Sequence, residues 1–492
     1  MNGSGVEEVE SSLVLGHAKL VENDLRQEKS RTLGVRAWEI FGFGTQYLWL
    51  FSIMFGSAFF SLSGDVEWAR FVKAVFALGF AVVYLVFFAL KNVVDFGSMG
   101  RVSIVLFGVV GSLGTMLVVF PSSGVSRVYI AFVASVLVGI SQASLMSLGN
   151  RAWSKMRPER VMVHLAGSAL VACALYFLLS CIPDVVSTVV VCLLPVVGGV
   201  ILSTTKKESL RARPLRKLDL NDGCLYLKIL AFVAAFSFPM GVVVGSATCG
   251  DAASFSYGSF VLVVGALCVA SFTFVLALRA APTGMLKILG SVGVPLIVAG
   301  CVFALAFWDE AFLFGGALVV AGFVAADLFM WFLNAELVSR SGCRPLEVLA
   351  RSCCVEWASF FIGFVFASGF FGDAAEFGIG RFLYALSAIV LVVVSSFVLT
   401  QVDLVRIVEA REGVQDKQGI EDACRSMAER FGLSARETEV MVYLANGRTV
   451  PYIQDKLTIS QSTVKTHVRN IYRKMGVKGK QELLDVIEKE IF

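Results

Sequence analysis

Residues 433–483 read LSARETEVMVYLANGRTVPYIQDKLTISQSTVKTHVRNIYRKMGVKGKQEL and form a charged stretch at the end of an otherwise apolar chain. Ser434 is placed to cap a helix, and Glu437 three residues later supplies the second half of a capping box. A second short helix begins near Pro451, whose fixed φ suits a first helical position. Ser460 is placed to cap a third helix. The stretch therefore predicts a compact module of short helices with a tight turn before the third.

The third helix of this module has one apolar face and one basic face. Its apolar residues, which recur at spacings of three and four, are Val464, Val468, Ile471 and Met475. The candidate DNA contacts on its other faces are Thr463, Lys465, Thr466, Arg469, Arg473 and Lys474. No acidic residue lies between Lys456 and Gln481. A tight turn followed by a basic helix is typical of proteins that read the DNA major groove, although a solvated basic face on an ordinary helix has the same charges.

Short motifs spread over the same stretch carry a family resemblance. The motifs are Arg436-Glu437, Glu439-Val440, Leu444-Ala445, Gly447, Ile453, Leu457, Ile459-Ser460, Thr463-Val464-Lys465-Thr466-His467, Asn470-Ile471-Tyr472, Lys474-Met475-Gly476-Val477 and Glu482-Leu483. Together they resemble the LuxR-type helix-turn-helix. The resemblance implies that Lys465, Thr466 and Arg469 face the major groove of double-stranded DNA, and that a last helix at about 479–489 mediates dimerisation. The scaffold residues that it implies are Glu437, Gly447, Ile453, Leu457, Ser460, Val464 and Val468.

The rest of the chain has the composition of a membrane protein. Of its 492 residues, 57% are hydrophobic and only 16% are charged, and the mean hydropathy is +0.77. After a polar segment, 1–40, in which we expect no cleaved signal peptide, about twelve apolar stretches are each long enough to cross a bilayer as a helix. They cover residues 41–62, 71–90, 102–120, 127–148, 161–182, 185–204, 224–245, 258–278, 287–307, 311–333, 350–372 and 381–400.

The loops between these stretches indicate an orientation. With the N-terminus inside, the inner loops hold Lys91, Arg101, Arg151, Lys155, Arg157, Arg160, Lys206, Lys207, Arg211, Arg213, Arg216, Lys217, Arg279, Lys287, Arg340 and Arg344. The outer loops hold little beyond Arg70, Lys73, Arg127 and Arg381. The positive-inside rule therefore predicts a multi-pass protein of the cytoplasmic (inner) membrane with both termini in the cytoplasm. The longest inner connection, 206–223, divides the spans into halves of about six, a layout similar to the major facilitator superfamily.

Polar residues inside the apolar stretches are candidates for the lining of a membrane cavity. Asp327 and Glu356 are the clearest, because a carboxyl group in a bilayer is costly unless it faces the protein interior or a partner. Weaker candidates are Gln46, Tyr47, Gln142, His164 and Trp331. The alternative is structural: both acids hold helices together by pairing with Arg351 or with backbone groups.

The expected fold is all-α, a polytopic helical bundle (41–400) joined by a cytoplasmic linker (401–432) to a small four-helix LuxR-type domain (433–492). The eleven cysteines have no metal-binding spacing, and no catalytic motif occurs, so we expect no metal, cofactor or enzymatic activity. The favoured interpretation is a membrane-bound transcription regulator whose spans sense an unknown small molecule and whose tails pair as a homodimer on DNA. The alternative is a secondary transporter with a regulatory or vestigial DNA-binding tail.

Overall fold

The computed structural model describes residues 37–56, 66–94, 99–119, 126–156, 158–204, 223–248, 252–279, 282–307, 312–341, 344–368, 379–398, 420–446, 448–477 and 479–491. The chain divides into two compact units, Met1–Thr400 and Gln401–Phe492. Most of the expected N-terminal segment (1–36) and much of the expected linker (401–419) lie outside the described residues.

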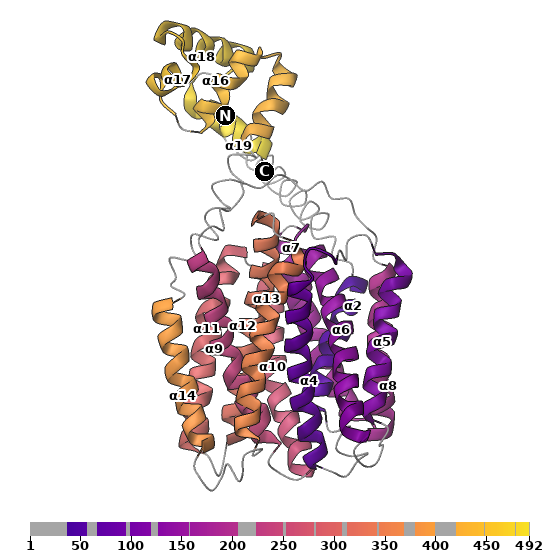
Figure 1. The fold of residues 1–492 in the computed structure, drawn as a ribbon. Coiled ribbons are helices and arrows are strands. Elements are labelled where there is room, and N and C mark those ends of the chain that lie inside the picture. The colour runs from indigo at the N-terminus through magenta and orange to yellow at the C-terminus, as the bar shows by residue number, and fades with distance from the viewer. Residues whose placement is uncertain are drawn as a thin grey trace, which may run out of the picture. The chain divides into compact units, whose positions relative to one another are not determined.

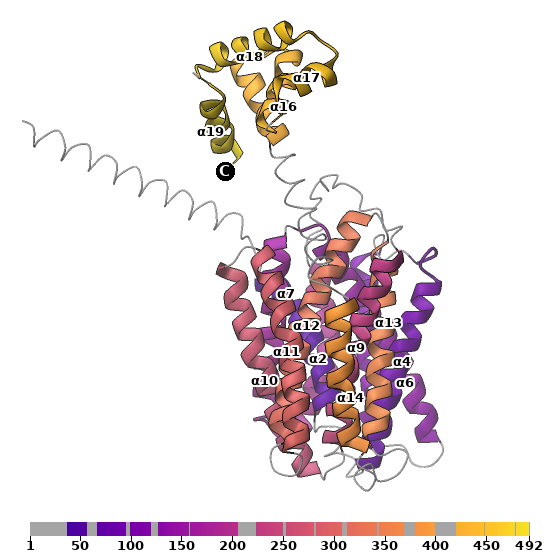
Figure 2. The ribbon, with the colours of Figure 1, turned by 90° about the vertical axis from the view of Figure 1, so that its left-hand side faces the viewer.

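The first unit is a bundle of long helices that run side by side (Figures 1 and 2). These are α2 (Ala37–Phe55), α4 (Val66–Ala89), α5 (Arg101–Val119), α6 (Ser126–Trp153), α7 (Pro158–Leu179), α8 (Asp184–Thr204), α9 (Gly223–Ala247), α10 (Ala252–Arg279), α11 (Pro282–Ala306), α12 (Phe312–Ser341), α13 (Pro345–Ala367) and α14 (Ile379–Val393), which continues into the π-helix η1 (Val394–Val398). Each predicted span coincides with one of these helices.

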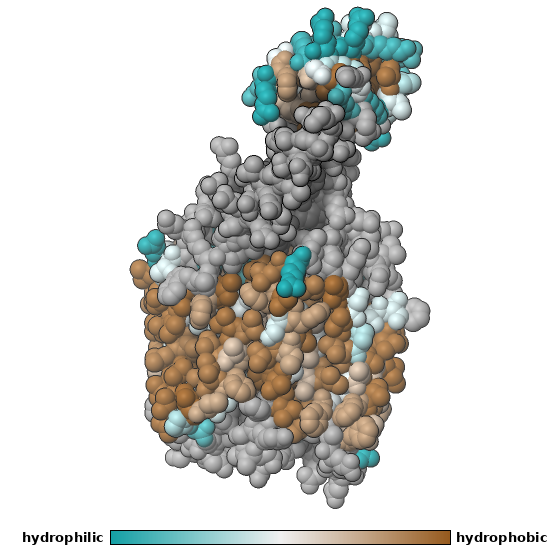
Figure 3. Space-filling model, turned by 180° about the vertical axis from the view of Figure 1, so that it is seen from behind, coloured by the Kyte–Doolittle hydropathy of each residue, from teal (hydrophilic) through white to brown (hydrophobic). Residues whose placement is uncertain are grey.

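The outer surface of this bundle is apolar, as lipid contact requires. Among the described residues, nine helices are long and apolar enough to cross a membrane, and two further apolar helices, Ser291–Ala306 and Gly380–Ser396, are shorter. Large hydrophobic side chains such as Leu85, Val102 and Phe382 are exposed on the outside of the helices. Figure 3, which views the molecule from behind Figure 1, shows that hydrophobic residues cover most of the described bundle surface on this face. The chain is therefore a multi-pass membrane protein.

The packing of the helices repeats between the two halves of the bundle. Helix α2 packs against α7 and α8, as α9 packs against α13 and α14. Helix α5 packs against α6 and α8, as α11 packs against α12 and α14, and the pair α4–α6 has its counterpart in α10–α12. The halves meet through α4 with α13 and through α7 with α10. This repeat is the two-half layout predicted from the sequence.

Small residues allow the closest helix contacts. A Cβ atom added to Gly241 on α9 would lie 2.1 Å from the carbonyl oxygen of Phe360 on α13. A Cβ atom added to Gly363 on α13 would lie 2.3 Å from the carbonyl oxygen of Phe238 on α9. The backbones of α9 and α13 thus touch, which is how membrane helices pack tightly without a hydrophobic driving force.

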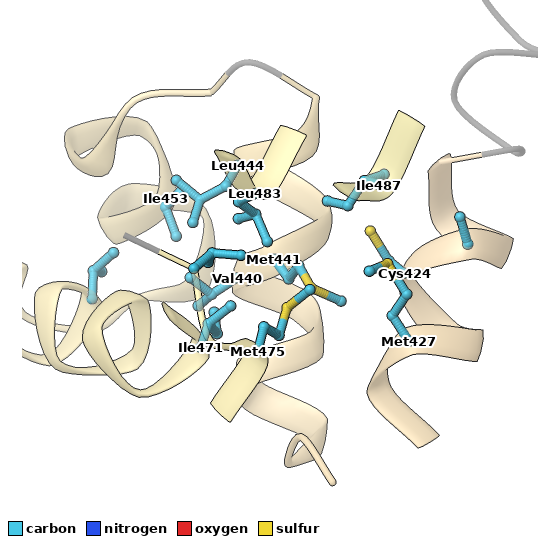
Figure 4. Packing of buried hydrophobic residues seen from close by; sticks show 13 residues of the cluster. Cys424, Met427, Val440, Met441, Leu444, Ile453, Ile471, Met475, Leu483 and Ile487 are labelled. Atoms are coloured by element: carbon cyan, nitrogen blue, oxygen red, sulfur yellow. The ribbon is translucent and has the colours of Figure 1, made fainter. Parts of the chain in front are cut away.

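The second unit is a small helical domain built around one apolar core. A helix over 420–431 precedes α16 (Ala435–Ala445), α17 (Val450–Leu457), α18 (Gln461–Met475) and α19 (Lys480–Ile491). The buried core consists of Ala423, Cys424, Met427, Val440, Met441, Leu444, Ile453, Val464, Ile471, Met475, Val477, Leu483 and Ile487. Figure 4 shows Cys424 and Met427 on a helix of their own, facing this cluster. The helix at 420–431 is therefore part of the folded unit.

Candidate DNA-binding surface and membrane cavity

The start of α16 is held by the predicted capping box. The backbone N–H of Glu437 donates to the Ser434 hydroxyl at 3.3 Å, and the Ser434 N–H donates to Glu437 Oε2 at 2.8 Å. The Lys474 ammonium, near the end of α18, donates to the same Glu437 oxygen at 2.7 Å and to the Gly432 carbonyl at 2.9 Å. Glu437 therefore ties the first helix of the module to the end of the third.

The contacts of Glu437 make the second unit sensitive to acid. The hydrogen bond from Lys474, with further help from Ser434, lowers the pKa of the Glu437 carboxyl to about 2. An unfolded glutamate has a pKa of about 4.3, so the charged carboxylate stabilises the folded state above that pH. This contribution is lost as the pH falls from about 4.3 toward the folded pKa of about 2.

We expect Glu437→Gln to lower the free energy of unfolding of the second unit by about 1–3 kcal/mol at neutral pH, because Lys474 loses a charged partner. The difference between wild type and variant should shrink as the pH falls below about 4.3, where the wild-type carboxylate is itself protonated. Urea unfolding of residues 420–492 at several pH values measures both effects. The matched control is Glu439→Gln, since the Glu439 side chain is 48% exposed. Equal losses in the two variants would contradict the role assigned to Glu437.

The turn between α17 and α18 sets the angle of the third helix. Thr458 ends α17 in the left-handed conformation, with φ at +53°. The N–H of Ile459 donates to the Gln454 carbonyl at 3.2 Å, which closes the last turn of α17. Ser460 then caps α18 by accepting a hydrogen bond from the Thr463 N–H at 3.2 Å. Three residues thus reverse the chain and start the next helix, as a helix-turn-helix requires.

Helix α18 divides into a buried and an exposed face, as predicted. Val464 and Ile471 are fully buried, Met475 is 8% exposed, and Val468 packs at the edge of the core. All six predicted DNA contacts are exposed: Thr463, Lys465, Thr466, Arg469, Arg473 and Lys474. Lys465 and Arg469 are one helical turn apart, so they lie on one face. Neither side chain has a hydrogen bond or ion pair to any part of the chain that the structure describes.

The remaining predicted DNA contacts and scaffold residues of the second unit differ in their surroundings. Thr466 donates to the Ser462 carbonyl at 3.0 Å, and Arg473 donates to the Asn470 side chain at 3.3 Å. Among the predicted DNA contacts, Lys474 is the one tied to α16, where it has a structural role. Of the predicted scaffold, Ile453 is fully buried and Leu457 packs against the core, whereas Gly447 lies outside the described residues.

Comparison with known proteins gives this module a family. Residues 432–487 match the family described as "Bacterial regulatory proteins, luxR family". Over 50 residues the chain is 40% identical to the spore germination protein GerE of Bacillus subtilis, and the match covers 68% of that protein. The chain belongs to the luxR family of bacterial regulatory proteins. Its second unit is a LuxR-type DNA-binding domain.

A longer relative shares only this domain. The LuxR-type domain is 51% identical over 45 residues to the probable transcriptional regulatory protein NarL of Mycobacterium tuberculosis. That match covers 9% of this chain and 21% of NarL, so the chain spans about a fifth of the length of this relative. The helix at 420–431 precedes the matched residues and still contributes Cys424 and Met427 to the core.

The membrane unit of this LuxR-family protein is similar in structure to transporters. A bacterial homologue of the iron transporter ferroportin, in an outward-facing state, aligns with 75% of this chain and 99% of its own, with a TM-score of 0.51 and 14% identity. The human organic anion transporter MFSD10 aligns with 74% of this chain and 99% of its own, with a TM-score of 0.50 and 14% identity. At these identities the likeness concerns the fold alone, and that fold is the predicted major-facilitator-like bundle.

The membrane unit contains a cavity between its two halves. It contains about 840 Å³ of space not filled by protein atoms, part of it open to solvent, and is lined by residues of α2, α4, α6 and α7 from the first half and of α9, α12 and α13 from the second. The predicted residues on its wall are Tyr47, Gln142, Asp327, Trp331 and Glu356. The structure thus brings together five side chains from four helices, α2, α6, α12 and α13.

Two other candidates lie elsewhere. The Gln46 side chain is directed at α8, where a Cβ atom on Gly198 would lie 1.9 Å from Gln46 Nε2. His164 has its Nε2 atom 3.2 Å from Glu39 Oε2 and its Nδ1 atom 2.8 Å from the Arg160 carbonyl oxygen. Neither residue lines the cavity. Lining residues that the sequence did not suggest include Tyr84, Ser237, Cys353 and Trp357, because each lies in an apolar run without a distinguishing signal.

The expected pairing of the cavity acids with Arg351 is wrong. The Arg351 guanidinium binds Glu347 at 2.8 Å, one turn earlier on α13, and lies over the Phe88 ring at 4.6 Å. Glu347 also accepts from the Lys91 ammonium at 2.6 Å, which joins the end of α4 to the start of α13. Arg351 therefore belongs to a cluster that connects the two halves, and it does not neutralise Asp327 or Glu356.

Proposed function

We propose that this LuxR-family protein is a membrane-embedded transcription regulator whose spans sense a small molecule and control the DNA-binding domain on the same chain. The observation that carries the proposal is the α18 surface. Lys465 and Arg469 are exposed and without partners in the described chain, on a helix whose other side is a buried stripe. A domain that had lost its role would have no reason to keep both the packing of α18 and its unsatisfied cations.

In the DNA step, α18 enters the major groove. Lys465 and Arg469 donate to guanine edges or phosphates, and the Thr466 methyl group contacts bases or sugars. Thr463 and Arg473 contact the backbone at the two ends of the helix. Two copies of the domain bind a two-fold site as a homodimer through the last helix, α19, so that each copy reads one half-site.

The proposed topology places both termini in the cytoplasm, where the DNA is. The even number of spans predicted from the sequence and the predicted arginine- and lysine-rich inner loops support it. About 20 residues separate the last described residue of the bundle from the helix at 420–431, and fully extended they span at most about 70 Å. DNA is therefore bound close to the inner membrane.

In the sensing step, the ligand occupies the cavity between the halves. Ligand binding changes the DNA-binding domain only if the ligand prefers one arrangement of the halves over another. The cluster of Lys91, Glu347 and Arg351 is a contact between the halves that differs between such arrangements. We propose that this preference alters how paired domains are presented to DNA.

A second candidate function is secondary transport, with the DNA-binding tail as an accessory. The observation in its favour is that the bundle shares its fold with transporters and has a cavity between the halves. Uptake or efflux of a cavity ligand by the full-length protein would be its positive evidence.

The decisive experiment is a genome-wide map of DNA crosslinked to the full-length protein in its native cell, beside the double variant Lys465→Ala/Arg469→Ala. Discrete sites that are lost in the variant support a regulator, and the neighbouring genes suggest the compound that is sensed. Absence of sites under several growth conditions would overturn the proposal in favour of transport.

A further inference from the structure

The ionisable side chains that line the cavity of the membrane unit include two carboxylic acids and no base. Asp327 on α12 and Glu356 on α13 are the charged residues among those that line it, and no lysine, arginine or histidine of the described chain is in the lining. The two carboxyl groups interact with each other electrostatically, and Asp327 also interacts with the indole N–H of Trp331. Two acids in an apolar surrounding are costly unless a positive charge joins them.

Nearby cations do not provide that charge. Arg351 is engaged by Glu347 and by the Phe88 and Tyr226 rings. Lys73 is buried on α4, about three helical turns from Tyr84, and its ammonium donates to the backbone carbonyl of Met54. The described chain therefore offers no positive charge to the two acids, and a cation from outside it would stabilise their charged forms.

A second observation points to a ligand at the same place. The Tyr47 hydroxyl, Gln142 Oε1 and the Ser237 hydroxyl have no hydrogen-bond partner within the described chain. These residues are only 5%, 3% and 0% exposed, and all three line the cavity. Buried polar groups in folded proteins are nearly always hydrogen-bonded, so these three are available to hydrogen-bond a molecule that enters the cavity. They come from α2, α6 and α9, on both sides of the cavity.

The rest of the wall is apolar, and much of it is aromatic. Rings on the lining include those of Tyr47, Tyr84, Phe323, Trp331, Trp357 and Phe360. The Tyr47 and Trp331 rings pack edge to face with centroids 6.5 Å apart. Aromatic faces attract cations, most strongly where water is excluded, and they also accept an apolar ligand body.

We infer that the cavity binds an organic ammonium compound with an aromatic or similar apolar body, its charged nitrogen held by Asp327 and Glu356. The inference rests on the proposed function in that it takes the cavity as the sensing site. A metal ion is a poorer fit, because no group of three or more histidine, cysteine, aspartate or glutamate side chains in the described chain is arranged to hold one. Tyr47, Gln142 and Ser237 are hydrogen-bond partners for any polar substituent that the ligand carries.

The test uses matched probes that differ only in charge. Purified full-length protein in lipid nanodiscs is titrated with tryptamine, tryptophol and indole-3-acetate, and with phenethylamine, 2-phenylethanol and phenylacetate, while thermal unfolding and binding are measured. We expect the amines to bind and to raise the unfolding temperature, and the alcohols and acids of the same shape to do neither. Equal responses within a series, binding of none of the amines, or stabilisation by divalent metal ions alone would overturn the inference.

Variants then test whether Asp327 and Glu356 bind the charged nitrogen of the ligand. Asp327→Asn and Glu356→Gln should each weaken amine binding by about 10- to 100-fold, because a charge-assisted contact is lost. Glu67→Gln is the matched control, since the Glu67 side chain is 81% exposed at the start of α4 and should leave binding unchanged. Unweakened binding in both cavity variants would overturn the inference. If a variant fails to give a monodisperse protein, the wild-type probe series still decides.

The same samples separate this inference from the proposed function. Amine binding with no change in occupancy of crosslinked DNA sites would support the ligand class and argue against the regulator. A compound that changes DNA occupancy while no amine binds would support the regulator and overturn the ligand class.

Discussion

The double variant Lys465→Ala/Arg469→Ala is expected to lose specific DNA binding while its fold is unchanged. Both side chains are exposed on α18 and have no hydrogen bond or ion pair in the described chain, so their removal leaves the core intact. Each single variant should weaken binding by about 1–3 kcal/mol if its side chain reads a base. A phosphate contact would instead weaken binding to all sequences and reduce the salt slope by about 1. Affinity for a crosslinked site and for unrelated DNA, at several salt concentrations, distinguishes the two.

The control for this loss must remove an equal charge elsewhere on the same domain. Arg425 on the helix at 420–431 is exposed and belongs to the same unit, so Arg425→Ala is the matched variant. We expect it to change affinity and salt slope far less than either α18 variant. If all three variants weaken binding equally, the basic residues act through overall charge, and α18 is not the reading helix.

Met427→Ala is expected to destabilise the LuxR-type domain by about 2–5 kcal/mol, although Met427 precedes the residues that match the family. The side chain is 1% exposed and faces the same core as Met441 and Met475. Its removal opens a cavity in a small domain whose total stability is of the same order. Urea unfolding of residues 420–492, compared with the wild type, measures the loss.

Glu429→Ala on the same helix is the control, because Glu429 is exposed and its replacement should change stability by less than about 0.5 kcal/mol. Equal stability of the two variants would mean that the helix at 420–431 is only an attached linker. The expected difference would make the helix at 420–431 a structural part of the DNA-binding domain.

The sequence alone predicted those features that depend on local patterns. Apolar runs of bilayer length predicted the long helices of the bundle, since a backbone in lipid must form helices. The spacing of Val464, Val468 and Ile471 predicted the buried face of α18 and, by exclusion, the exposed Lys465 and Arg469. The capping residues Ser434 and Ser460 marked where helices start.

Only the tertiary structure decided which distant residues meet. A membrane helix is apolar on all sides, so its sequence does not specify which face turns inward, and a rotation about its axis exchanges one lining residue for another. For this reason Tyr84 and Ser237 were not predicted on the cavity wall, whereas the side chain of Gln46, a predicted lining residue, is directed at α8. The same holds for Lys474, whose partner Glu437 lies 37 residues earlier in the chain and reaches it only after α16 packs on α18.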